Sequence, residues 1–161
     1  MGLVIYIYFS YSANLPAFVE EVRKEDVRSK AFQLSEILLN DPGDPADWWG
    51  GSAPNIKRIG LSDENSNKTN LISKLKVDKL DSLCRPPTGN FENVQQKLAL
   101  DKPFSIHVFN FSQDSGERNL IIDCIPTDFP KTSINATIKR ITVLNNTDTG
   151  ELELAEIIVQ M

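Results

Sequence analysis

The chain has 161 residues, a length typical of one domain with room for an appendage. Its 17 Lys and Arg against 22 Asp and Glu give a net charge of -5, which argues against a broad phosphate-binding face and so against nucleic-acid binding. One His and two Cys are too few for a four-ligand His/Cys zinc site and leave few candidates for a general base near neutral pH. Most enzyme classes therefore lose support, and we expect no cofactor.

The first segment, Leu3 to Phe9 (LVIYIYF), is apolar at every position and is followed by the polar Ser10, Ser12 and Asn14. About 20 apolar residues are needed to cross a bilayer, and this run supplies roughly half. Two interpretations stay open. The run is a β-strand, since Val, Ile, Tyr and Phe favour strands, or it is the end of a longer membrane helix whose upstream part is missing from this chain.

From Pro16 to Asn40 the sequence contains no Gly and no further Pro, and Pro suits the first turn of a helix. Apolar residues recur through it at helical spacings. They are Phe18, Val22, Val27, Ala31, Leu34 and Leu38, with Phe32 and Ile37 beside them. Mixed charges occupy the other positions, so the pattern predicts one amphipathic helix with a solvated charged side.

The helix should end in the Pro- and Gly-rich segment from Asn40 to Asn55. Asp41, Asp44 and Asp47 lie three residues apart there and are weak candidates for calcium ligands, although Asp before Pro is a common way to begin a turn. Trp48 and Trp49 follow. We expect one indole ring to anchor the loop on the helix, and the other is a candidate contact residue for a ligand.

The remaining chain predicts two short helices and then strands. The helices are Leu71 to Cys84 and Phe91 to Leu100; the strands are Phe104 to Phe111, Leu120 to Ile125, Thr137 to Leu144 and Glu151 to Met161. We therefore expect an α+β fold in which the long N-terminal amphipathic helix covers one face of an antiparallel β-meander of about four strands. Residues 1–15 would be the helix end or anchor, and residues 16–161 a single head domain.

Few residues suggest chemistry. His107 lies in the middle of a strand and is most simply structural, and no known nucleophile, phosphate-loop or metalloprotease motif occurs. A weak enzyme hypothesis would use carboxylates such as Asp123 or Asp128. Cys84 and Cys124 would close a loop of 40 residues if they pair, which an oxidising compartment would favour; the sequence leaves the pairing open.

Four Asn-x-Ser/Thr acceptor sites for N-glycans occur, at Asn67, Asn110, Asn135 and Asn145. Asn67 and Asn145 fall in expected loops, where a glycan fits easily. Asn110 and Asn135 lie nearer to expected strands. This set of sites favours a location outside the cytoplasm.

The order of these segments resembles archaeal type IV pilin-like proteins of the class III signal peptide group. The similarity covers about residues 3–110 and is most specific between Leu38 and Leu61. It is carried by Leu38, Leu39, Pro42, Gly43, Pro45 and Trp48, then by Ile59, Gly60 and Leu61 and by Lys79 and Leu80. The chain departs from the pattern in having no processing site, no acidic residue near the start of the apolar helix, and a short apolar run.

The resemblance implies a non-enzymatic glycoprotein held at the cell surface or assembled into a type IV pilus. Its N-terminal helix would contact the membrane or like subunits, and homo-oligomers would follow. The alternative, from another class, is a secreted binding module that recognises a glycan or a surface partner through Trp48 and Trp49.

Overall fold

A computed structural model describes residues 2–50, 55–63, 70–85, 91–112, 116–126, 129 and 136–161, with the side chains of residues 2–14 and 17 left aside. Helix α1 (Gly2–Asn40) is one continuous helix of 39 residues, about 58 Å long at 1.5 Å per residue. The strand interpretation of the run from Leu3 to Phe9 is therefore wrong. Pro16 lies inside α1 instead of at its first turn, so the expected boundary after residue 15 falls within one helix.

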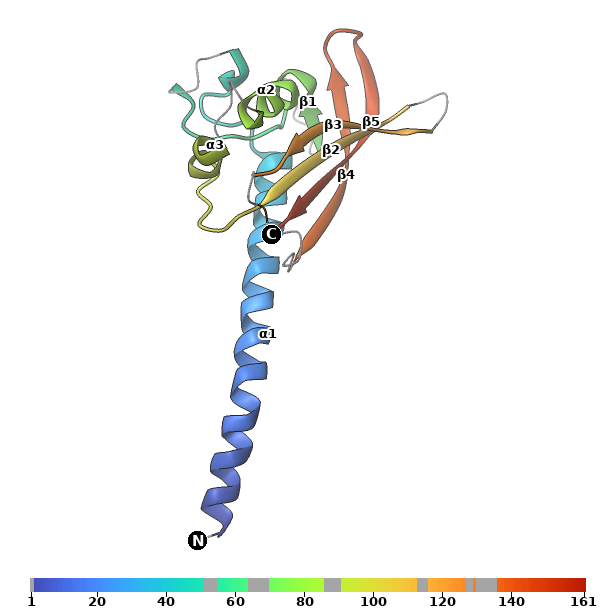
Figure 1. Ribbon diagram of the computed structural model, residues 1–161. Coiled ribbons are helices and arrows are strands. Elements are labelled where there is room, and N and C mark those ends of the chain that lie inside the picture. The colour runs from blue at the N-terminus through green and yellow to red at the C-terminus, as the bar shows by residue number, and fades with distance from the viewer. Residues whose placement is uncertain are drawn as a thin grey trace.

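Among the residues of α1 whose side chains are described, those that pack against the rest of the protein lie in its C-terminal part. Leu34 and Leu38 are at most 1% exposed, whereas Phe18 is 65% and Val22 is 53% exposed. The expectation that these residues share one buried face is therefore wrong for Phe18 and Val22. Figure 1 shows α1 extending far beyond the other elements, with the N-terminus at its free end. We call residues 2–25 the stalk and the rest of the chain the head.

Short elements follow the break after α1. They are a 3-10 turn, η1 (Trp48–Gly50), then β1 (Leu71–Ser73), α2 (Lys74–Cys84) and α3 (Phe91–Lys97). The helix expected from Leu71 thus begins three residues late. The reason is tertiary: Leu71 and Ile72 pair in parallel with Val143 and Leu144, and this pairing holds the segment extended.

The sheet has five strands and is mixed. Its other members are β2 (Ser105–Phe111), β3 (Arg118–Cys124), β4 (Thr137–Asn146) and β5 (Glu151–Gln160), in the spatial order β1-β4-β5-β2-β3. The α+β class is confirmed, but the expected four-stranded meander is wrong. β1 adds a parallel edge strand, and β5 lies between β4 and β2, so the consecutive strands β3 and β4 are not neighbours.

The two faces of the sheet have different surroundings. Ile106, Val108, Ile157 and Val159 are fully buried on the inner face, which Figure 1 shows on the same side of the sheet as all three helices. β2 alternates between the two faces: His107, Phe109 and Phe111 lie on the outer face and are half-buried. The core is therefore a single layer between helices and sheet.

Candidate functional site

Trp48 is a core residue. Its side chain is fully buried, and its indole Nε1 donates a hydrogen bond to the carbonyl of Gly60 at 2.9 Å. Gly43 has a φ of 89°, and a Cβ there would lie 2.5 Å from the Trp48 ring, so only glycine fits beside it. Trp49 is half-buried. Of the two candidate contact residues, the structure therefore leaves only Trp49 accessible to a ligand.

The three candidate calcium ligands face different partners. The carboxylate of Asp41 lies 2.7 Å from Nε of Arg58 and accepts the backbone N–H of Gly43 at 2.7 Å. Asp44 lies 3.8 Å from Lys57, and Asp47 is exposed. Across the described residues, no group of three His, Cys, Asp or Glu side chains is placed to hold a metal ion. Asp41 closes the turn after α1 instead.

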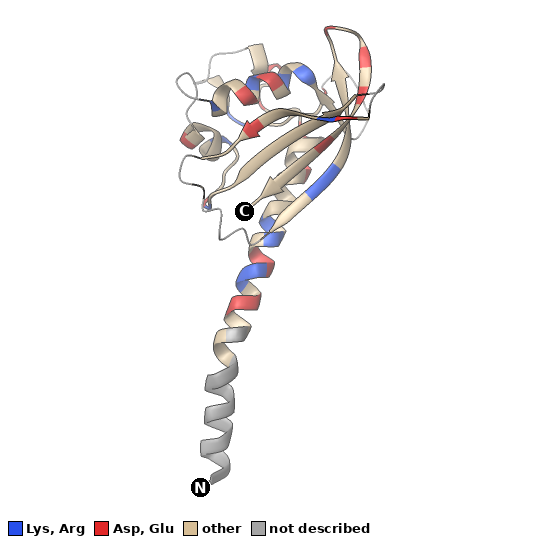
Figure 2. Cartoon of the chain, turned by 45° about the vertical axis from the view of Figure 1, so that its right-hand side comes forward, with Lys and Arg blue, Asp and Glu red and all other residues tan. Residues whose placement is uncertain are grey.

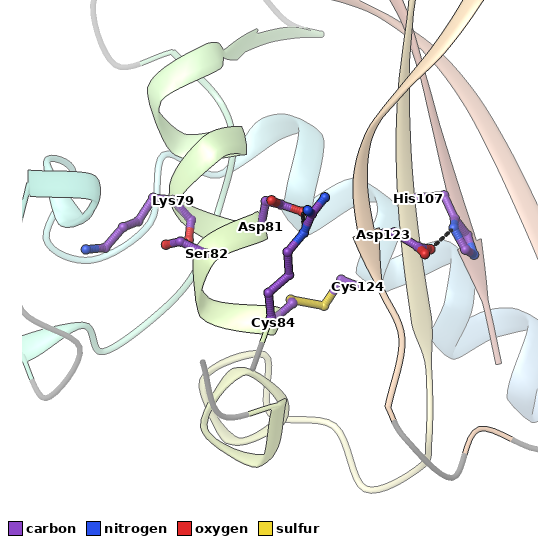
Figure 3. The surroundings of a disulfide bond; sticks show 8 residues. Lys79, Asp81, Ser82, Cys84, His107, Asp123 and Cys124 are labelled. Carbon is purple, nitrogen blue, oxygen red and sulfur yellow. Dashed lines mark hydrogen bonds and ion pairs between the residues drawn. A yellow bond between two sulfur atoms is a disulfide. The ribbon is translucent and has the colours of Figure 1, made fainter. Parts of the chain in front are cut away.

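Cys84 and Cys124 form a disulfide, with their Cα atoms 5.2 Å apart. The bridge ties the C-terminal end of α2 to the end of β3, as Figure 3 shows, and both residues are buried. The sequence left this pairing open because it does not show whether the Cβ atoms meet.

His107 has two polar neighbours that sequence reasoning missed. Its Nδ1 lies 3.0 Å from a carboxylate oxygen of Asp123, and its Nε2 lies 3.3 Å from the hydroxyl of Ser105 (Figure 3 shows the Asp123 contact). Strand alternation predicts that Ser105, two residues away, shares a face with His107, but it does not show that the two side chains are in contact.

Ser105, His107 and Asp123 lie in the order of the nucleophile, base and orienting acid of a catalytic triad, but the serine hydroxyl is not accessible to a substrate. Ser105 is fully buried, and its hydroxyl donates to Oε1 of Gln160 at 3.1 Å. A substrate cannot approach that oxygen in this conformation. Asp128, the other carboxylate considered, lies outside the described residues.

Two of the four glycan acceptor residues are described, and both lie in strands. Nδ2 of Asn110 in β2 donates to Glu153 at 2.6 Å, and Nδ2 of Asn145 donates to Asp63 at 2.6 Å. Asn145 was expected in a loop, but β4 continues to Asn146. Hydrogen bonds from Asn110 and Asn146 hold the pKa of the Glu153 carboxyl below its ordinary 4.5. Asn67 and Asn135 lie outside the described residues.

A group of four charges marks the point where the stalk meets the head. Lys102 lies 2.7 Å from Asp26, and Lys30 lies 3.0 Å from Asp101. We call these four residues the collar. The hydrogen bond from Lys102 lowers the pKa of Asp26, and that from Lys30 lowers the pKa of Asp101. Figure 2 shows the charged residues of α1 gathered in this region.

The stalk carries an apolar stripe just before the collar. Leu15, Phe18, Val19 and Val22 are between 43% and 65% exposed. Their spacing of three and four residues places them on one side of the helix. At 3.6 residues per turn, the centre of this stripe is about 130° around the axis from the side that Leu34 and Leu38 bury. The stripe therefore does not continue the face that packs on the sheet.

A second exposed apolar surface lies on the outer face of the sheet, which we call the open sheet face. It consists of Leu120, Ile141, Leu152 and Leu154, which are between 50% and 60% exposed, with Phe109 and Val143 half-buried among them. The charge within it is neutralised, because Arg118 lies 2.6 Å from Glu156 and 3.5 Å from the centroid of the Phe109 ring. Polar residues usually cover a sheet face that meets water.

Comparison of the chain with protein-family models, with characterised proteins and with solved structures finds no match. A search of the described helices for a segment that could span a membrane also finds none.

Proposed function

We propose that the protein is a non-enzymatic, pilin-like surface protein located outside the cytoplasm, whose stalk attaches the head to a membrane or to like subunits. The observation that carries this proposal is the form of α1. One continuous helix buries its last turns against the sheet, extends beyond the head, and contains the wholly apolar run from Leu3 to Phe9.

Two further features support this location. The buried disulfide between Cys84 and Cys124 suits an oxidising compartment, where such bonds form and persist. The four glycan acceptor sequences suit the same compartments. The resemblance to archaeal pilin-like proteins adds the type of assembly: an anchored or filament-forming subunit with an exposed α+β head.

Vesicle flotation tests the attachment. We expect the full chain to float with lipid vesicles, and the double variant Ile5→Glu with Ile7→Glu to remain at the bottom of the gradient, because two charges oppose burial of the run in lipid. The matched control is Leu120→Glu with Ile125→Glu, which adds the same charges at exposed positions of the head and should float. A wild-type chain that does not float would refute membrane attachment.

A secreted binding module is the second candidate, and the accessibility of Trp49 favours it. A half-buried indole beside the exposed Asp47 could stack on a sugar ring or a partner's side chain. Retention of the chain on a glycan array, lost in Trp49→Ala, would support it. Equal retention of the variant would count against it.

A further inference from the structure

The protein presents two exposed apolar surfaces of different shape. The stalk stripe is a narrow ridge on a helix, whereas the open sheet face is broad and lies on four neighbouring strands. Exposed apolar patches of this kind usually mark an interaction site. Each surface is therefore a candidate docking site, and a ridge on a helix is the kind of surface that packs on a broad sheet face.

The inner face of the same sheet shows how this chain covers a sheet with a helix. Leu34 and Leu38 of α1 are buried against it, and Glu36 of α1 forms an ion pair with Arg140 of β4. Packing a helix stripe on an apolar sheet face is a standard layer arrangement. A second helix on the open sheet face would complete a three-layer structure.

A stalk stripe that docks on this face comes from another copy of the chain. Because α1 is continuous, its stripe is held beyond the collar, and it points about 130° away from the side that packs on the sheet. The stripe of one chain therefore cannot reach the open sheet face of the same chain.

Charges beside the two surfaces are complementary. At 3.6 residues per turn, Glu21 and Glu25 lie on one side of the stripe and Arg23 lies on the other. On the outer face of the sheet, Asp123 of β3, His107 of β2, Ile158 of β5 and Lys139 of β4 are cross-strand partners in one line across the strands. Lys139 and Asp123 are the two ends of this line. A helix can lie along the strands of this face in either of two directions. One of them places Glu21 and Glu25 near Lys139, and Arg23 near Asp123.

We propose that the stalk stripe of one copy docks on the open sheet face of a second copy. The two surfaces are different, so the contact is heterologous: each copy uses one surface with each neighbour, and the contact repeats into a row of subunits or a closed ring. The proposal names a partner for the surface protein proposed above, and it holds with or without attachment to a membrane.

Cysteine cross-linking of the full chain tests the contact directly. Both native cysteines are in the disulfide, so the engineered thiols at Val19→Cys and Leu154→Cys are the reactive ones. After oxidation on vesicles or in solution, the double variant should give a ladder of dimers, trimers and longer products on a non-reducing gel. Each single variant should remain monomeric.

The single variants identify the two competing arrangements. Dimers from Val19→Cys alone would indicate stalk-to-stalk packing, and dimers from Leu154→Cys alone would indicate sheet-to-sheet packing. Either result, or a double variant without a ladder, overturns the proposal. Vesicle flotation is a separate readout, so loss of the ladder and loss of membrane attachment can be told apart.

A mixing experiment gives a second test. Phe18→Glu removes the ridge and Ile141→Glu removes the face, and both positions are at least 60% exposed, so the fold should persist in circular dichroism. Each variant alone should sediment as a monomer. An equal mixture should sediment as a dimer, because one intact stripe meets one intact face. A mixture that stays monomeric, or a variant that still forms higher oligomers by itself, contradicts the contact.

Discussion

At the scale of single residues, the most informative contrast is between the two adjacent tryptophans. Trp48 is enclosed by the core and held by its hydrogen bond to Gly60, whereas Trp49 is half-buried. We expect Trp48→Ala to lower the free energy of unfolding by about 3 to 5 kcal/mol, and Trp49→Ala to lower it by much less. Urea unfolding of both variants checks this. Equal losses would show that the Trp49 ring is as deeply packed.

Gly60 is a second position where one added methyl group matters. A Cβ there would lie 2.0 Å from the carbonyl oxygen of Asp41, an atom of the backbone that cannot swing aside. We expect Gly60→Ala to lower the thermal midpoint markedly, with differential scanning calorimetry as the measurement. Gly150→Ala is a stringent control: no atom lies within 4 Å of its added Cβ, and only its φ of 74° opposes the change. A loss at Gly60 no larger than that at Gly150 would contradict this account.

Residue-level roles were predictable only where spacing along the chain carried them. The pattern identified Leu34 and Leu38 as core residues, because helical periodicity depends on neighbours within a few positions. It did not distinguish Trp48 from Trp49, since the choice depends on Gly43 and on Gly60, which is 12 residues from Trp48. The pairing of Cys84 with Cys124 depends likewise on how α2 lies against β3.

At the scale of elements, the disulfide joins α2 to β3, which are separated along the chain by α3 and β2. Removing it with Cys84→Ser and Cys124→Ser together should lower the free energy of unfolding by about 2 to 5 kcal/mol, because the unfolded chain gains the freedom of a 40-residue loop. Denaturation with and without reductant checks this. The reductant should weaken the wild type and leave the double variant unchanged.

The β4–β5 hairpin contains a carboxylate whose ionisation supports the fold. Asn110 and Asn146 donate to Glu153 and lower its pKa below 4.5, so its charged form is more favoured in the folded chain than in the unfolded chain. The resulting stabilisation is complete above the ordinary pKa and is lost as pH falls through the lowered one. We expect Glu153→Gln to flatten the dependence of unfolding free energy on pH below 4.5. If Glu153→Gln leaves the pH dependence at acidic pH unchanged, other groups produce that dependence.

The type of most elements was predictable from the sequence, but the spatial order of the strands in the sheet was not. Alternation located β2, β4 and β5 to within a few residues, since it reflects burial on one face. β1 was missed because three residues are too few to show a period, and their extended shape comes from pairing with β4. The position of β5 between β4 and β2 depends on long-range pairing, which alternation along one strand does not encode.

At the scale of the whole molecule, the collar lies where the stalk meets the head. Lys30 and Lys102 bridge Asp26 of α1 to the loop at Asp101, and these contacts are exposed to solvent. Salt screens such pairs. The burial of Leu34 and Leu38 depends much less on salt, so the head should remain folded when the collar weakens.

The continuity of α1 also bears on how the molecule carries tension. A pull on the free end of the rod runs along the helix axis and reaches the head through Leu34, Leu38 and the sheet strands beneath them. Because β4 and β5 are interior strands of the sheet, the load enters at its middle instead of peeling an edge strand. The disulfide between α2 and β3 then limits how far the edge strand β3 can be pulled away from α2.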